Sequence, residues 1–166
     1  MKGAITGDIV GSVYEFDNYR AEDFPLFRND CFFTDDTVMT IAVADALMSA
    51  KGATNEEIIA ALTEKMQFYG RLYPDAGYGG RFAWWLVRDR PKPYNSWGNG
   101  APMRCSAAGW LASSAEEARR LGSLTAMPTH NHPEGIKAAA LTAELIFLAR
   151  KGVDMAALRE RAAREY

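Results

Sequence analysis

Helical periodicity constrains the fold of this chain more than any other feature of its sequence. Apolar residues recur at three- and four-residue intervals, as at Ile5, Ile9 and Val13, whereas the period-two alternation of β-branched residues is absent. Caps and stop signals bound the periodic segments. They predict helices over residues 3–14, 35–50, 55–69, 81–88, 103–113, 115–123, 134–151 and from 154 onward. We therefore predict an all-α, single-domain multi-helix bundle over residues 1–166, a length that allows one hydrophobic core.

Charge and cysteine content exclude several function classes. The net charge is −2, and Lys and Arg are scattered along the chain, so we expect no nucleic-acid groove and no membrane-surface patch. No stretch reaches the roughly 18 apolar residues that a membrane-spanning helix needs. Asp8 interrupts the apolar start, which argues against a signal peptide. Two cysteines, Cys31 and Cys105, are too few for a secreted disulfide scaffold, so we expect reduced thiols and a cytoplasmic location.

The stretch Thr34-Asp35-Asp36-Thr37 places two acids at the start of an apolar helix. One interpretation is a helix cap, because Thr and Asp are favoured N-caps and acids suit the first turn. The other is a metal site, because hard divalent cations prefer clusters of carboxylate and hydroxyl oxygens. Capping needs only one acid, so the second is unexplained. The residues alone leave both interpretations open.

The first predicted helix carries Asp8, Ser12 and Glu15 at helical spacing, so these polar residues share one face. Gly7 and Gly11 are four residues apart and predict close packing of this helix against a neighbour. The alternative is a polar face turned to water with a glycine seam behind it.

Two later segments are candidates for ligand contact. In "YNSWGNGAPMR", residues 94–104, two glycines around Asn99 predict positive φ and exposed backbone N–H groups that could cradle a phosphate, and Trp97 could stack on a base. An ordinary loop is the alternative, since no established phosphate fingerprint is present. "THNHPEG", residues 129–135, holds both histidines. Two histidines do not make a zinc site, and Pro133 suits a helix start, so we favour ligand contact for His130.

Five motifs in order resemble the ADP-ribosylglycohydrolase family, which includes the dinitrogenase reductase-activating glycohydrolase. They are Gly-Asp-x-x-Gly with a following Glu, Thr-Asp-Asp-Thr, Gly-Tyr-Gly-Gly, Ser-Trp-Gly-Asn-Gly-Ala-Pro-Met-Arg and Thr-His-Asn-His-Pro-Glu-Gly. The resemblance covers nearly the whole chain, which corresponds to the N-terminal two-thirds of the family pattern. It implies an all-α fold, two divalent ions (Mg²⁺ or Mn²⁺), and removal of ADP-ribose from modified proteins or small molecules.

The resemblance also implies residue roles. Thr34, Asp35 and Asp36 correspond to the first half of the metal cluster, and Glu15 and Asp35 to the catalytic residues. The predicted substrate contacts lie on two glycine loops and one histidine: Gly77, Gly79, Gly80, Ser96, Trp97, Gly98, Asn99, Gly100 and His130.

One departure opens alternatives. The family's second metal motif, Asp-x-Asp-Thr, is missing, so we expect a C-terminally truncated domain, which is either a fragment of a longer protein or a natural short form with a weakened or single-metal site. One alternative is therefore a non-catalytic ADP-ribose-binding fragment or regulator, and a weaker one is a phosphohydrolase acting on the diphosphate. Missing helices would expose apolar surface on residues 36–50 and 134–151, and we expect self-association or association with a C-terminal fragment.

Overall fold

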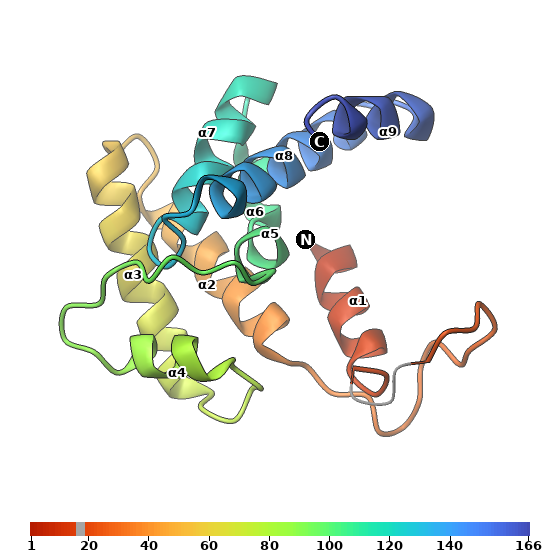
Figure 1. Ribbon diagram of the computed structural model, residues 1–166, viewed down its shortest axis with the longest axis horizontal. Coiled ribbons are helices and arrows are strands. Elements are labelled where there is room, and N and C mark those ends of the chain that lie inside the picture. Colours follow the sequence, from red (N-terminus) through yellow and green to blue (C-terminus); the bar gives the residue numbers. More distant parts are fainter. Residues whose placement is uncertain (16–18) are drawn as a thin grey trace.

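The computed structural model describes residues 1–15 and 19–166, and every regular element in this part of the chain is a helix (Figure 1). The all-α class that the periodicity predicts is confirmed, with no strand among the described residues. The helices are α1 (Lys2–Gly11), α2 (Asp35–Ser49), α3 (Asn55–Leu72), α4 (Gly80–Leu86), α5 (Gly100–Arg104), α6 (Ser106–Leu111), α7 (Ala115–Ala126), α8 (Pro133–Arg150) and α9 (Met155–Ala163).

The core is built around α2 and α8. In Figure 1, α2 lies between α1 and α3, and it packs against both. α7 and α6 pack on α8, and glycines allow the helices to approach closely. A Cβ on Gly122 would lie 2.6 Å from the carbonyl oxygen of Ala139, and one on Gly109 would lie 2.5 Å from that of Ala143. These two positions therefore exclude any larger residue without a shift of α8.

The close packing predicted for Gly7 and Gly11 is wrong. A Cβ at either position would meet no described atom within 4 Å, and α1 contributes no fully buried residue. α1 ends at Gly11 rather than at residue 14, and it lies at the periphery of the bundle (Figure 1). The small residues of α1 thus leave it loosely packed, and polar contacts described below attach it to α2.

The predicted helix ends are largely confirmed. Thr54 and Glu57 form a reciprocal capping box at α3, and Pro133 occupies the first turn of α8. The single helix predicted over 103–113 is instead two helices that divide at Cys105. The backbone N–H of Cys105 bonds to the carbonyl of Pro102, three residues back, so the chain tightens there and changes direction.

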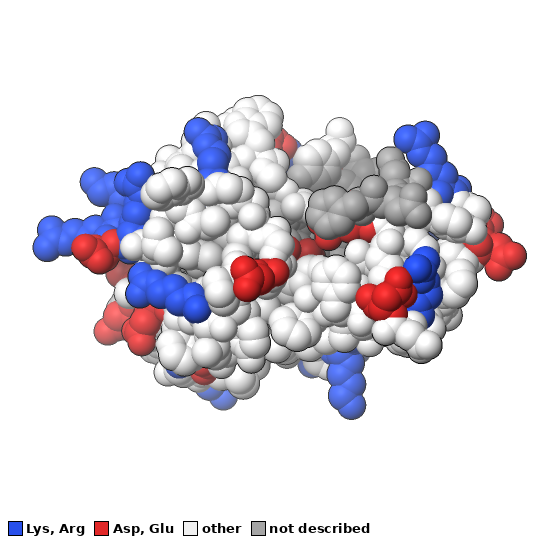
Figure 2. Space-filling model, turned by 90° about the horizontal axis from the view of Figure 1, so that it is seen from below, with Lys and Arg blue, Asp and Glu red and all other residues white. Residues whose placement is uncertain are grey.

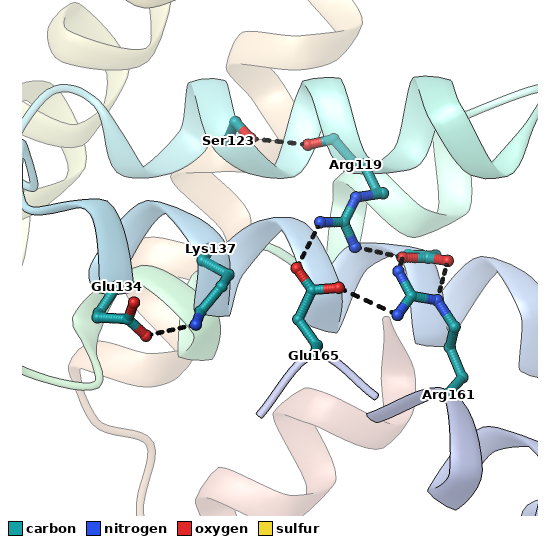
Figure 3. A network of polar contacts seen from close by, with 7 residues as sticks. Arg119, Ser123, Glu134, Lys137, Arg161 and Glu165 are labelled. Carbon is teal, nitrogen blue, oxygen red and sulfur yellow. Dashed lines mark hydrogen bonds and ion pairs between the residues drawn. The ribbon is translucent and has the colours of Figure 1, made fainter. Parts of the chain in front are cut away.

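Ion pairs rather than apolar burial attach α9, which has no buried residue. Arg119 of α7 and Arg161 of α9 both bind Glu144 of α8 and Glu165 near the C-terminus (Figure 3). Glu144 is buried and is bound by both guanidinium groups. A network of this kind is worth more than isolated surface pairs because its carboxylate is shielded from water.

The exposed apolar surface predicted for the two long helices is confirmed for only one of them. On α2, Ile41 and Met48 are exposed, whereas α8 carries no exposed large apolar side chain. α7 and α6 cover α8, which explains the difference. Among the described residues, no helix combines the length and the hydropathy needed to cross a membrane.

Candidate functional site

Asp8 joins α1 to the first turn of α2. Its carboxylate accepts the backbone N–H of Thr34 at 2.8 Å and that of Thr37 at 3.1 Å, and both threonine hydroxyls donate to it as well. A carboxylate that accepts several hydrogen bonds at a helix N-terminus is a strong cap. Asp8 therefore caps α2 from a different helix, a role that its spacing on α1 did not reveal.

Capping by Asp8 and Thr34 leaves the two acids of α2 without a structural partner. Thr34 is the N-cap and accepts the N–H of Asp36 at 3.4 Å. Neither Asp35 nor Asp36 accepts a side-chain hydrogen bond or an ion pair from a described residue. The cap interpretation thus accounts for Thr34 but not for the carboxylates of Asp35 and Asp36.

The electrostatics of this acidic cluster favour a cation. Burial, followed by repulsion from Asp36, Glu15 and Asp8, raises the pKa of Asp35 to about 7. Burial and the charges of Asp8 and Glu15 also raise the pKa of Asp36. A bound cation would reverse this repulsion and favour the ionised carboxylates.

The two carboxylates face different but adjoining cavities. Asp35 lines a cavity of about 330 Å³ that the glycine loops enclose. Asp36 lines a second cavity of about 520 Å³ together with Glu15 and Thr34. Asn99 and Met103 line both cavities. The predicted catalytic and metal-binding residues therefore lie around one divided cleft.

Most of the predicted substrate contacts line the first of these cavities: Gly79, Gly80, Ser96, Gly98, Asn99, Gly100 and His130. Two do not. Gly77 lies outside the lining and has a φ of 93° in the turn before α4. Trp97 also lies outside it, and its ring packs on His132 with 3.9 Å between centroids.

The glycines that line the first cavity leave free space beside the backbone, and none of them adopts a positive φ. The positive φ expected beside Asn99 is wrong, because the left-handed residue of this loop is Asn95, with a φ of 53°. A Cβ on Gly79 would meet no described atom within 4 Å, and one on Gly98 would lie 3.5 Å from the Ser96 hydroxyl. Protein packing would tolerate side chains here, so the free space is available to a ligand.

A chain of buried hydrogen bonds supports the second glycine loop. Arg104 donates to the Thr129 hydroxyl at 2.8 Å, Thr129 contacts Nδ1 of His130 at 2.7 Å, and Nε2 of His130 contacts the Gly98 carbonyl at 3.1 Å. The carbonyl can only accept, so Nε2 carries the proton and Nδ1 accepts from Thr129. Burial and the charge of Arg104 lower the pKa of His130, which agrees with a neutral ring.

This chain of bonds changes the expected role of His130. Both ring nitrogens are bound by protein groups, so the ring offers a ligand only its carbon atoms in this conformation. The ligand contact predicted for His130 remains a prediction. The structure adds that His130 holds the carbonyl of Gly98.

Arg104 places an unbalanced positive charge beneath the cleft. Its side chain is fully buried and donates to the Thr125 carbonyl and Thr129, but no described carboxylate pairs with it. Burial lowers the pKa of Arg104 to about 10, so it stays protonated at neutral pH. Because Arg104 lines the cavity, it would attract an anionic ligand there.

Sequence reasoning missed five residues that line this cavity: Arg81, Phe82, Tyr94, Met103 and Arg104. Arg81 follows directly after the Gly79-Gly80 pair, and Arg104 lies one helical turn after Gly100. The available signal in the sequence was their position next to the glycine loops, because each of the two glycine motifs is followed by an arginine.

The acidic cluster alone is not a complete metal site. Within the described part of the chain, no group of three His, Cys, Asp or Glu side chains converges as a metal site would require. Thr34, Asp35 and Asp36 do supply hydroxyl and carboxylate oxygens, which suit Mg²⁺ or Mn²⁺. These oxygens would fill only part of the coordination shell of such an ion.

Comparison with known proteins agrees with the motifs and the fold. The family model described as ADP-ribosylglycohydrolase matches residues 1–166. The "ADP-ribosylhydrolase ARH3" of Mus musculus is 25% identical over 183 residues, an alignment that covers 92% of this chain and 48% of the mouse protein. The chain thus spans about half the length of this curated relative. On the strength of the family match along its whole length, the chain belongs to the ADP-ribosylglycohydrolase family.

Proposed function

We propose that this chain carries part of the catalytic site of a metal-dependent hydrolase that removes ADP-ribose from a modified protein or small molecule by cleaving the glycosidic bond. The observation that carries the proposal is the pair Asp35 and Asp36, whose carboxylates pair with no cation in the described part of the chain and face two adjoining cavities. Family membership and the name of the mouse relative support the same reaction class.

The residues of the cleft suggest a division of roles. Thr34, Asp35 and Asp36 would hold Mg²⁺ or Mn²⁺, which supplies Lewis-acid stabilisation of developing negative charge when bound. The backbone N–H groups of Gly79 and Gly80 would donate to the diphosphate, with the Arg104 guanidinium in the wall of the same cavity. Glu15, on the second cavity with Asp36, would move a proton to or from the scissile bond or the attacking water.

The proposed reaction requires the metal ligands that this chain does not contain. The family's Asp-x-Asp-Thr motif is missing here, and a divalent ion needs about six oxygen ligands. We propose that a C-terminal fragment that carries this motif supplies the rest. If no such fragment binds, the alternative is a non-catalytic ADP-ribose binder, which the cavity at the glycine loops favours.

The two unpaired cysteines suit a reducing, cytoplasmic compartment.

Calorimetric titration of ADP-ribose, with and without Mg²⁺ or Mn²⁺, tests the proposal. We expect metal-dependent binding that Asp35→Asn abolishes, and release of free ADP-ribose from an ADP-ribosylated substrate. Metal-independent binding without turnover would favour the binder instead. Release of AMP and ribose phosphate would show diphosphate cleavage and contradict the glycosidic assignment.

A further inference from the structure

A third cavity, beside the two cavities of the candidate cleft, is lined by positively charged side chains and aromatic rings. Its volume is about 610 Å³, and it lies against α4 and the segment that follows. Its cations are Arg81, Arg88, Arg90 and Lys92, and its lining contains no acidic residue. Lys and Arg thus gather here, although they looked scattered in the sequence. Figure 2 shows several Lys and Arg side chains, with Asp and Glu side chains among them, at the end of the molecule where Figure 1 draws the segment between α4 and α5.

The cations of this cavity are not neutralised by ion pairs. None of its four cations forms an ion pair with a carboxylate in the described part of the chain. Elsewhere, cations such as Lys65 and Arg119 do pair with acids. Several unpaired guanidinium groups around one hollow are the usual means of binding phosphate oxygens, because each offers two parallel N–H donors.

The aromatic residues of the cavity add a surface for a planar group. Trp84 is 71% exposed, an unusual exposure for the largest side chain. Trp85 is buried, and its indole N–H has no hydrogen-bond partner among the described residues. An exposed indole stacks well on a nucleobase, and a stacked base is compatible with phosphates held by nearby arginines.

We infer that this cavity binds a nucleoside diphosphate or a similar phosphate-bearing nucleotide, at a site separate from the candidate cleft. The arginines and Lys92 would hold the phosphates, and Trp84 would stack on the base. An acidic peptide would satisfy the cations but would leave Trp84 without a planar partner, so the aromatic residues favour the nucleotide. Arg81 and Tyr94 line both this cavity and the candidate cleft, so a ligand here would lie beside the substrate.

The test uses ADP as the probe and the indole N–H signals of the ¹⁵N-labelled chain as a site-resolved readout, with EDTA present. We expect ADP to shift the Trp84 and Trp85 signals in a saturable manner. Arg88→Gln with Arg90→Gln should weaken this binding at least tenfold. The matched control is Lys2→Gln with Arg159→Gln, which removes two exposed cations outside the cavity and should leave it unchanged.

A second comparison tests the base. Trp84→Ala should weaken ADP binding about tenfold, the effect expected of one stacked base, and leave the binding of inorganic pyrophosphate unchanged. Three results would overturn the inference: no shift at Trp84 and Trp85, equal weakening by the control pair, or oligoglutamate binding as tightly as ADP. Failure of the proposed hydrolase would show instead in the metal-dependent titration of ADP-ribose, which these variants do not address.

Discussion

The two sides of the candidate cleft are built in opposite ways. On the α5–α8 side, buried hydrogen bonds connect Arg104, Thr129, His130 and the Gly98 carbonyl, so the loop is held before any ligand arrives. On the α1–α2 side, Asp35 and Asp36 repel each other without a protein cation, and α1 is attached mainly through Asp8. The loop side is preorganised by the protein, whereas the acidic side carries mutually repelling carboxylates that no cation of a described residue pairs with.

The largest expected effect tests the preorganised side. Arg104→Met should destabilise the fold by about 2–4 kcal/mol, because it leaves the buried Thr125 carbonyl and the Thr129–His130 pair without their donor. Urea unfolding measures the loss. Arg159→Met, at an exposed position, is the matched control and should change stability by less than about 0.5 kcal/mol. Similar stability of both variants would show that the loop does not depend on Arg104.

The next effect concerns the attachment of α1. Asp8→Ala removes the acceptor of four hydrogen bonds and should cost about 1–3 kcal/mol. Because α1 has no fully buried residue, we expect hydrogen exchange to rise across α1 far more than across α7. Uniform exchange across both helices would mean that apolar contacts, rather than Asp8, hold α1.

The acidic side should also show a pH dependence of stability. The pKa of Asp35 is about 7 in the folded chain and about 3.8 when it is unperturbed, so the folded state binds more protons between these values. The stability of the wild-type chain should therefore fall as the pH rises from about 4 to 7. Asp35→Asn should be more stable than the wild type by about 1–2 kcal/mol at pH 7.5, a value reduced for solvent screening, and equal to it near pH 4.

Thermal unfolding at both pH values measures this difference. Mg²⁺ or Mn²⁺ should raise the melting temperature of the wild type at pH 7.5 but not that of Asp35→Asn. A wild-type stability that does not change between pH 4 and 7.5 would contradict the repulsion that we assign to the acidic cluster.

The smallest effect on stability is expected for a glycine of the cleft, in contrast to a glycine at which two helices pack. Gly98→Ala should change stability by less than about 0.5 kcal/mol, since a Cβ meets its nearest atom at 3.5 Å, but it should weaken ADP-ribose binding. Gly122→Ala is the contrasting variant and should destabilise strongly, because its Cβ would lie 2.6 Å from a carbonyl oxygen. Urea unfolding and calorimetry on both variants test the distinction.

Local patterns in the sequence were enough to predict the helices and most of the cleft. The spacing of apolar residues, the helix caps and Pro133 predicted helix positions because these signals act within one turn of the chain. The ordered motifs indicated the family and the residues of the glycine loops that line the cavity. Helix ends next to loops were less predictable, as the division at Cys105 shows.

Only the tertiary structure decided how these residues act together. Asp8 caps a helix that begins 27 residues later, and Arg104 supports His130 from 26 residues away, so neither contact leaves a local pattern. The packing glycines are Gly109 and Gly122 rather than Gly7 and Gly11, because close approach depends on which helix lies opposite. The sequence by itself determined the helices and the residues available for chemistry. Long-range contacts determined which of those residues are already bound by protein groups and which remain free for a ligand.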